Sequence, residues 1–169
     1  GITDRQFVDL LVEKSQGNFM YLRYVLPEIE YGAYTDLDME ALPAGLRNYY
    51  EDQWRRMRGR DEEGWFEYKL PIVMALTVVK EPVSIDLIAD FAGVEQRPRI
   101  RTVLQEWQQF LYEEQVPYGV GLQKRYRIYH ASFHDFIADK EEVADERVSR
   151  RDAHQKIADK LWTDLFGDE

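Results

Sequence analysis

The hydrophobic pattern of this chain changes its period once, and that change limits the folds it can adopt. Up to about Phe110, apolar residues recur three and four positions apart, as they do in amphipathic helices. From Leu111 onward the period becomes two, over 111–116 and again over 124–129, with a glycine-containing stretch at 117–121 between them. Two such runs around a short glycine loop predict a β-hairpin. We therefore expect a mainly helical chain with one small hairpin.

The stretch before the hairpin predicts three helices. They lie near 70–79, after the N-cap residue Ser84, and from 96 or 98 to 110. Three helices followed by a hairpin is the element order of a winged helix, a helix-turn-helix variant with a β wing. Two more helices are expected after the hairpin, one from Ser132 and one over 153–165.

The first sixty residues predict a separate helical part. Thr3 and Gln6 form a capping-box pattern, and Gly17 is placed to end the first helix. The second helix is expected to bury Phe19, Leu22, Val25, Leu26 and Ile29, and the third Leu46, Tyr49, Tyr50, Trp54 and Met57. A charged break at 59–64 then suggests a boundary. The expected organisation is a helical subdomain over 1–60 and a winged-helix domain with C-terminal helices over 61–169.

Composition excludes several classes of protein. The net charge of −10 opposes non-specific attraction to nucleic acid or to an anionic membrane surface. Cysteine is absent, so the chain has no disulfide and no thiolate nucleophile or metal ligand. No apolar run reaches the roughly twenty residues that span a bilayer, and no signal peptide is visible. We expect a cytoplasmic protein with no membrane contact.

The motifs of nucleotide hydrolysis and of metal catalysis are missing. There is no phosphate-binding loop motif, no dinucleotide-binding glycine fingerprint and no zinc-binding His-Glu-x-x-His. His130 and His134 are four apart, but a change from strand to helix between them is unfavourable for a metal pair, and His134 is expected to be exposed. The chain alone is thus predicted to have no catalytic residues, no metal site and no cofactor.

His130 is the most informative candidate site residue. It follows a basic strand in which alternation places Tyr126, Ile128 and His130 on one face and Arg127 on the other. Ser132 and Asp135 form a capping-box pattern, so a helix is expected to begin at Ser132. An imidazole beside a helix N-terminus suits an anion such as a phosphate. The alternative is a histidine that is hydrogen-bonded within the fold.

The segment His130-Ala131-Ser132-Phe133-His134-Asp135-Phe136, after the winged-helix pattern, resembles the C-terminal half of the nucleotide-binding core of STAND-class NTPases, particularly the NACHT branch. Two earlier segments are also similar to that family. They are Lys14-Ser15-Gln16-Gly17-Asn18-Phe19, followed by Tyr21-Leu22-Arg23-Tyr24-Val25-Leu26, and Leu42-Pro43-Ala44-Gly45-Leu46 with Tyr49-Tyr50. The three motifs occur in the family's order and span most of the chain.

The resemblance implies a regulatory switch. In the family, the winged-helix histidine contacts the β-phosphate of bound ADP, and exchange for ATP frees the winged helix to rotate and the protein to oligomerise and signal. By position, His130 is the ADP sensor, while Gly17, Asn18 and Phe19 border the nucleotide from the helical side. ADP or ATP with Mg²⁺ would bind in a longer parent protein carrying a P-loop ATPase domain and a repeat sensor domain. The start at Gly1, inside a capping signal, suggests such a fragment.

Two other functions compete with the switch. The first is a DNA-binding winged-helix regulator, in which six basic residues contact the duplex: Arg97, Arg99 and Arg101 on the third helix and Lys124, Arg125 and Arg127 on the wing. The net charge of −10 opposes this function. The second is a nucleotide-independent interaction scaffold whose exposed aromatic residues contact another domain.

Overall fold

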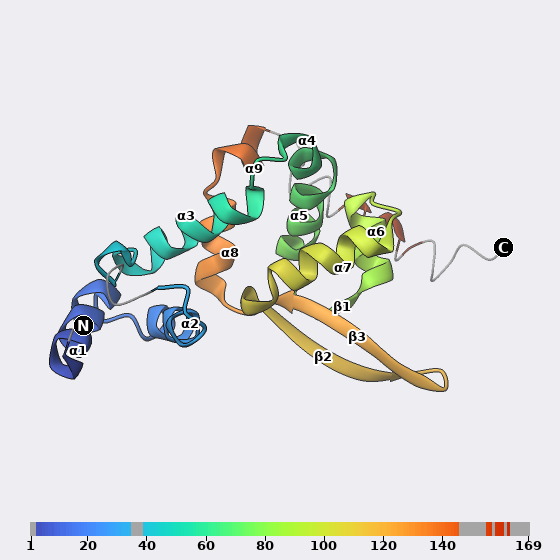
Figure 1. Cartoon of the computed structure of the whole chain (residues 1–169). Helices are drawn as coiled ribbons and strands as arrows, with labels where there is room; N and C mark the ends of the chain where they lie inside the picture. The colour runs from blue at the N-terminus through green and yellow to red at the C-terminus, as the bar shows by residue number, and fades with distance from the viewer. Residues whose placement is uncertain (1–2, 35–38, 146–154, 157, 161, 163–169) are drawn as a thin grey trace. The chain divides into compact units, whose positions relative to one another are not determined.

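The computed structural model describes residues 3–34, 39–145, 155–156, 158–160 and 162. The chain is mainly helical, with one small antiparallel sheet (Figure 1). It forms two compact units, Gly1–Met57 and Arg58–Glu169. The assignment of 1–60 and 61–169 to two functional domains stays a prediction.

Three helices make up most of the first unit: α1 (Asp4–Ser15), α2 (Phe19–Glu30) and α3 (Gly45–Arg58), with the short 3-10 turn η1 (Met39–Ala41) before α3. The predicted capping box at the start of α1 is confirmed, since Thr3 and Gln6 exchange side-chain and backbone hydrogen bonds. Gln16 and Gly17, with φ of 52° and 74°, end the helix in the left-handed region.

The core of the first unit is built from tyrosines. Tyr21, Tyr24, Tyr49 and Tyr50 are all at most 4% exposed. The rings of Tyr24 and Tyr49 stack with centroids 5.6 Å apart. The predicted buried face of α3 is confirmed at Tyr49, Tyr50, Trp54 and Met57.

The predicted buried face of α2 is wrong in part. Phe19 is 77% exposed and Leu26 39% exposed, whereas Val25 is buried as predicted and Tyr21 and Tyr24 are buried as well. A phenol can enter a core when its hydroxyl finds an acceptor. The Tyr21 hydroxyl does so by donating to the Pro43 carbonyl oxygen at 2.7 Å. The buried face of α2 is therefore rotated from the predicted one towards the tyrosines.

The second unit begins with a continuous helical stretch of three segments: α4 (Glu62–Gly64), the π-helical turn η2 (Trp65–Lys69) and α5 (Leu70–Val78). Every residue from Ile72 to Val78 is buried. Because α5 is apolar on all sides, it forms the centre of this unit. Pro71 lies in the first turn of α5, directly after the π-helical turn, and has no N–H to donate to that turn.

The next elements are β1 (Val83–Ser84), α6 (Ile85–Ala92), α7 (Arg97–Glu106), the 3-10 turn η3 (Gln108–Phe110), β2 (Leu111–Tyr118) and β3 (Gly121–Ile128). The three predicted helices and the hairpin are thus confirmed. Ser84 caps α6 by accepting from the Leu87 N–H at 3.3 Å, and Gly93 ends that helix with φ of 66°. The hairpin turns at Gly119 and Val120, and Figure 1 shows it projecting beyond the helices of this unit.

The sheet has the strand order β1-β3-β2, with both pairs antiparallel. β1 was not predicted from the sequence, because a two-residue strand is too short to show a period. β1 adds to β3 where Val83 faces Tyr126 and Ser84 faces Arg125. The strand that leads to His130 is therefore paired on both sides near its end.

Helices α8 (Ala131–Ala138) and α9 (Glu141–Asp145) follow the sheet. Phe133 of α8 stacks on Phe110 at a centroid distance of 4.0 Å and lies 5.6 Å from the ring of Trp107. This aromatic cluster anchors α8. The helix predicted over 153–165 lies largely outside the described residues, as does His154. Within the described part of the chain, no helix has the length and apolar character to cross a bilayer.

Candidate functional site

His130 is the N-cap residue of α8. Its backbone is extended, with φ of −124° and ψ of 134°, and its Nδ1 accepts from the Ser132 N–H at 3.2 Å and lies 2.7 Å from the Ser132 Oγ. The predicted start of the helix at Ser132, with a Ser132–Asp135 capping box, is therefore wrong. The imidazole takes the role of an Asn or Asp cap, because Nδ1 reaches the amide two residues ahead.

This contact determines the tautomer of the ring. A backbone N–H can only donate, so Nδ1 must be the acceptor and the proton of the neutral imidazole lies on Nε2. Within the described residues, the Nε2–H of His130 has no hydrogen-bond partner. The side chain is only partly buried. His130 is thus hydrogen-bonded within the fold through Nδ1, as the alternative interpretation expected, and its role in binding an anion stays a prediction.

At the N-terminus of α8, fewer backbone N–H groups than expected are available to an anion. The His130 carbonyl oxygen accepts from the Phe133 N–H at 3.1 Å and from the His134 N–H at 3.3 Å, and the ring accepts from Ser132. Most of the first-turn amides are therefore already satisfied. An anion here would be bound mainly by side chains.

A cavity of about 550 Å³ lies beside His130. Three segments line it: the end of α5 with the residues after it (76–80), the end of β3 with the residues after it (127–131), and His134. Its lining includes Lys80 and Arg127 together with both histidines, and none of the described lining residues is acidic. In a chain with a net charge of −10, this is a local concentration of hydrogen-bond donors and positive charge. We call it the His130 cavity.

His134 was predicted to be exposed, but the prediction is wrong. Its side chain is 33% exposed, and Nε2 donates to the Thr77 carbonyl oxygen at 2.8 Å. Thr77 lies in the last turn of α5, where carbonyl groups have no partner within the helix. His134 therefore ties α8 to the end of α5 and holds one wall of the His130 cavity in place.

Lys80 and Arg127 were not predicted from the sequence as neighbours of His130. Alternation placed Arg127 on the opposite face of the strand, but β3 ends at Ile128 and the chain bends at Tyr129, which brings both residues to one cavity. The Arg127 guanidinium lies 4.9 Å from the ring centroid of Tyr112, which orients it. Lys80 is exposed and makes no ion pair within the described residues. The run of basic residues before His130 was the sequence feature from which a role for Arg127 could have been predicted.

The predicted residues Gly17, Asn18 and Phe19 form the loop between α1 and α2 and the first turn of α2. Asn18 is occupied as a helix cap, since its Oδ1 accepts from the Met20 N–H at 2.9 Å. Phe19 exposes most of its ring. These residues belong to the first unit and His130 to the second, so their sharing of one nucleotide stays a prediction.

The basic residues predicted to contact DNA are largely engaged in the fold. Carboxylates pair with three of them: Arg97 with Asp86 at 3.1 Å, Arg99 with Glu67 at 2.7 Å and Lys124 with Glu113 at 2.7 Å. These pairs reduce the positive charge that α7 and the hairpin offer to a phosphate backbone. Three or more carboxylate or imidazole groups that could hold a metal do not cluster anywhere in the described residues.

No family model, curated protein or solved structure matches the chain. The likeness to STAND NTPases therefore rests on the sequence motifs given above.

Proposed function

We propose that this chain is a regulatory, non-catalytic module of a cytoplasmic STAND signalling NTPase. In this proposal residues 1–60 are the helical subdomain that follows the ATPase fold, and 61–169 are a winged-helix domain. The module senses whether ADP or ATP is bound and passes that state on through a rearrangement of domains. A P-loop ATPase domain of the parent protein supplies the remaining phosphate ligands and the Mg²⁺ site.

The topology of the second unit supports the winged-helix assignment. The order α5, β1, α6, α7, β2, β3 and the sheet order β1-β3-β2 agree with what is expected of a helix-turn-helix followed by a two-stranded wing. The strongly apolar α5 is suited to be the first, buried helix of such a domain.

The observation that carries the proposed sensor is the state of the His130 ring. Capping of Ser132 through Nδ1 leaves the proton on Nε2, so the side chain has the tautomer needed to donate to a phosphate oxygen. The His130 cavity adds Lys80 and Arg127, whose charges complement a diphosphate. The fold therefore pre-orients the donor before any ligand arrives, which lowers the entropy cost of binding.

The energy of one such contact is large enough for a switch. A hydrogen bond to a charged group contributes about 1.5–3 kcal/mol, or roughly tenfold to a hundredfold in an equilibrium. Allosteric couplings are typically of this size. Loss of the contact when ATP replaces ADP would release the winged helix and allow the parent protein to oligomerise. The isolated chain, lacking the other phosphate ligands, is expected to bind ADP weakly or not at all.

The test is an ADP titration on the parent protein with His130→Asn. Asparagine retains an N-cap acceptor for the Ser132 N–H, but it is too short to place a donor where Nε2 lies. We expect ADP to bind about tenfold more weakly. Lys80→Gln should weaken ADP binding by a smaller factor, because Lys80 is exposed and its charge is screened.

Arg125→Gln is the matched control. It removes a positive charge from the same strand without touching the lining of the His130 cavity. Its ADP affinity should stay within about twofold of the wild type. Unchanged ADP binding by His130→Asn, with α8 intact, would refute the assigned role of His130.

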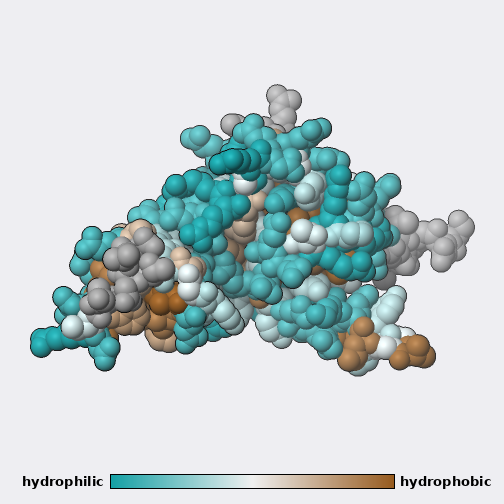
Figure 2. All heavy atoms as spheres, in the orientation of Figure 1, coloured by the Kyte–Doolittle hydropathy of each residue, from teal (hydrophilic) through white to brown (hydrophobic). Residues whose placement is uncertain are grey.

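The interaction scaffold is the second candidate, and the hairpin tip favours it. Tyr118, Val120 and Leu122 are 66%, 112% and 68% exposed, and Figure 2 shows the apolar surface at the end of the hairpin. An exposed apolar patch commonly marks a protein contact. A scaffold would bind its partner equally with and without ADP, whereas the proposed switch requires a difference.

DNA binding is tested directly with a duplex at low salt. We expect no salt-dependent affinity in the micromolar range, because carboxylates already pair with three of the six candidate cations. Binding that weakens steeply with added salt would instead favour the DNA-binding winged helix.

A further inference from the structure

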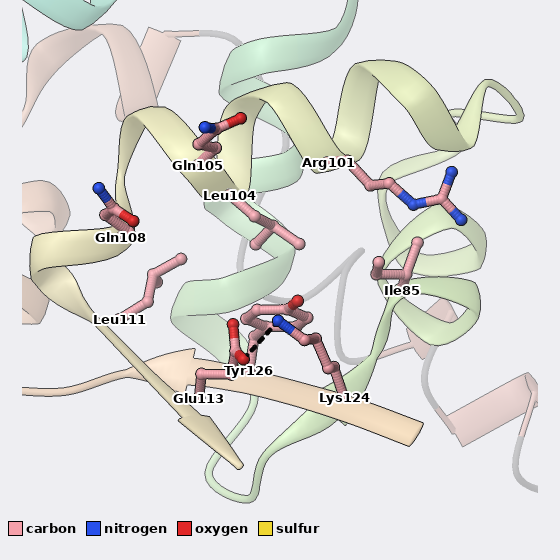
Figure 3. Close-up of a pocket in the computed structure, with 9 residues that line it drawn as sticks. All are labelled: Ile85, Arg101, Leu104, Gln105, Gln108, Leu111, Glu113, Lys124 and Tyr126. Carbon is pink, nitrogen blue, oxygen red and sulfur yellow. Dashed lines mark ion pairs between the residues drawn. The ribbon is translucent and has the colours of Figure 1, made fainter. Parts of the chain in front are cut away.

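A second cavity, of about 440 Å³, lies between α7 and the hairpin and shares no lining residue with the His130 cavity. Its lining comes from the start of α6, from α7 and η3, and from both strands of the hairpin. Cavities of about 300–1,000 Å³ are the usual size for small-molecule ligands. We call this the α7–hairpin cavity, and Figure 3 shows its lining.

The inner walls of this cavity are apolar. Leu104 points from α7 towards the ring of Tyr126 on β3, and Leu111 and Ile85 flank them (Figure 3). Leu104 is 4% exposed and Tyr126 8% exposed, so both side chains are held by packing. A rigid apolar floor of this kind takes an aromatic ring or a branched aliphatic group.

The hairpin side of the cavity is closed by an ion pair. Lys124 Nζ lies 2.7 Å from Glu113 Oε1, beside the ring of Tyr126 (Figure 3). The two charges compensate each other, so this wall is close to neutral. Burial and the charge of Glu113 both raise the pKa of the Tyr126 phenol.

The α7 side carries an uncompensated positive charge. Arg97 and Arg99, on the same helix, pair with Asp86 and Glu67. Arg101 is exposed, lines the cavity and makes no ion pair within the described part of the chain. The carboxamides of Gln105 and Gln108 line the same side and likewise have no hydrogen-bond partner among the described residues. The polar groups of this cavity thus present one cation and two neutral amides above an apolar floor.

We propose that the α7–hairpin cavity binds a small organic anion that has one carboxylate and an aromatic or branched aliphatic body. The body packs on Leu104, Leu111 and Tyr126, and the carboxylate accepts from the guanidinium of Arg101. The carboxamides of Gln105 and Gln108 supply additional donors at the rim. This site is distinct from the proposed nucleotide sensor, because the two cavities have no lining residue in common.

The test uses the 169-residue chain and two probes of the same shape, 1-naphthoate and the uncharged 1-naphthamide. Amide resonances are followed by NMR during each titration. We expect 1-naphthoate to shift the resonances of Leu104, Leu111 and Tyr126, with a dissociation constant of about millimolar or tighter. Because Arg101 is exposed, the carboxylate should bind about three- to tenfold more tightly than the amide.

Two matched variants test whether the charge of Arg101 binds the carboxylate. Arg101→Gln should remove the preference for 1-naphthoate over 1-naphthamide, while Arg97→Gln, which removes a charge from the same helix outside the cavity, should preserve it. Arg101 is exposed and Arg97 is partly exposed, so neither change disturbs the core.

Three results would overturn the proposal. The first is the absence of shifts at the α7–hairpin cavity at millimolar 1-naphthoate. The second is equal binding of the two probes to the wild-type chain. The third is an equal loss of the preference in both arginine variants, which would indicate a general effect of charge.

Discussion

The clearest test of the site is the effect of His130 on stability, measured with two substitutions at that position. His130→Ala removes the acceptor for the Ser132 N–H, and His130→Asn replaces it with another N-cap acceptor. The two variants both remove the imidazole, so their difference isolates helix capping. This comparison also decides whether His130→Asn can be used to test nucleotide sensing in a folded protein.

The size of the effect follows from the contacts of the ring. One first-turn amide of α8 loses its acceptor in His130→Ala, and removal of an N-cap side chain costs about 0.5–2 kcal/mol. We expect a loss of about 1 kcal/mol in the free energy of unfolding of the second unit. For a unit of this size the melting temperature falls by about 3–6 °C. His130→Asn should lie within a few tenths of a kcal/mol of the wild type.

Urea denaturation followed by circular dichroism measures the free energy of unfolding for each variant. Amide hydrogen exchange across α8 provides a local measurement, because fraying of the first turn raises exchange at Ser132 before it affects the core around Phe133. We expect faster exchange in His130→Ala and near wild-type exchange in His130→Asn. Equal destabilisation of both variants would refute capping as the role of Nδ1, and so would the absence of any change in His130→Ala.

Three further predictions concern stability. Tyr49→Phe should lower the free energy of unfolding by about 2 kcal/mol in chemical denaturation, because the buried Tyr49 hydroxyl donates to Glu28 Oε1 at 2.7 Å; an unchanged midpoint would contradict this. Burial, with the nearby phenol of Tyr34 and the charge of Glu28, raises the pKa of Tyr21 to about 12. The stability that depends on its neutral phenol is therefore complete below pH 10 and is lost towards pH 12. Comparison with Tyr21→Phe isolates this residue, and tyrosinate absorbance near pH 10 that the substitution removes from the folded protein would contradict the prediction. Gly93→Ala should lower the free energy of unfolding by about 1 kcal/mol in thermal denaturation. The φ of Gly93 is 66°, which is strained for alanine, and no atom would contact the added methyl to offset that strain. A neutral result would contradict this and show that the turn relaxes.

Local interactions made much of the fold predictable. The caps at Thr3 and Ser84 and the left-handed helix end at Gly93 depend on residues within four positions of one another. The hairpin could be predicted for the same reason, since alternation and a glycine loop are properties of one short segment. β1 could not be predicted, because its pairing with β3 brings together residues about forty positions apart.

The sequence by itself determined most of the helices and the hairpin, because their patterns are local, and it indicated His130 as the residue of interest. Only the tertiary structure decided what that residue does. Its Nδ1 caps α8, its Nε2–H is left as a donor, and its neighbours in the cavity include Lys80 from a distant segment. The bond from His134 to the Thr77 carbonyl oxygen crosses 57 positions. Periodicity and capping patterns describe neighbours along the chain, whereas the composition of a cavity depends on how separate segments pack, and no local pattern encodes that packing.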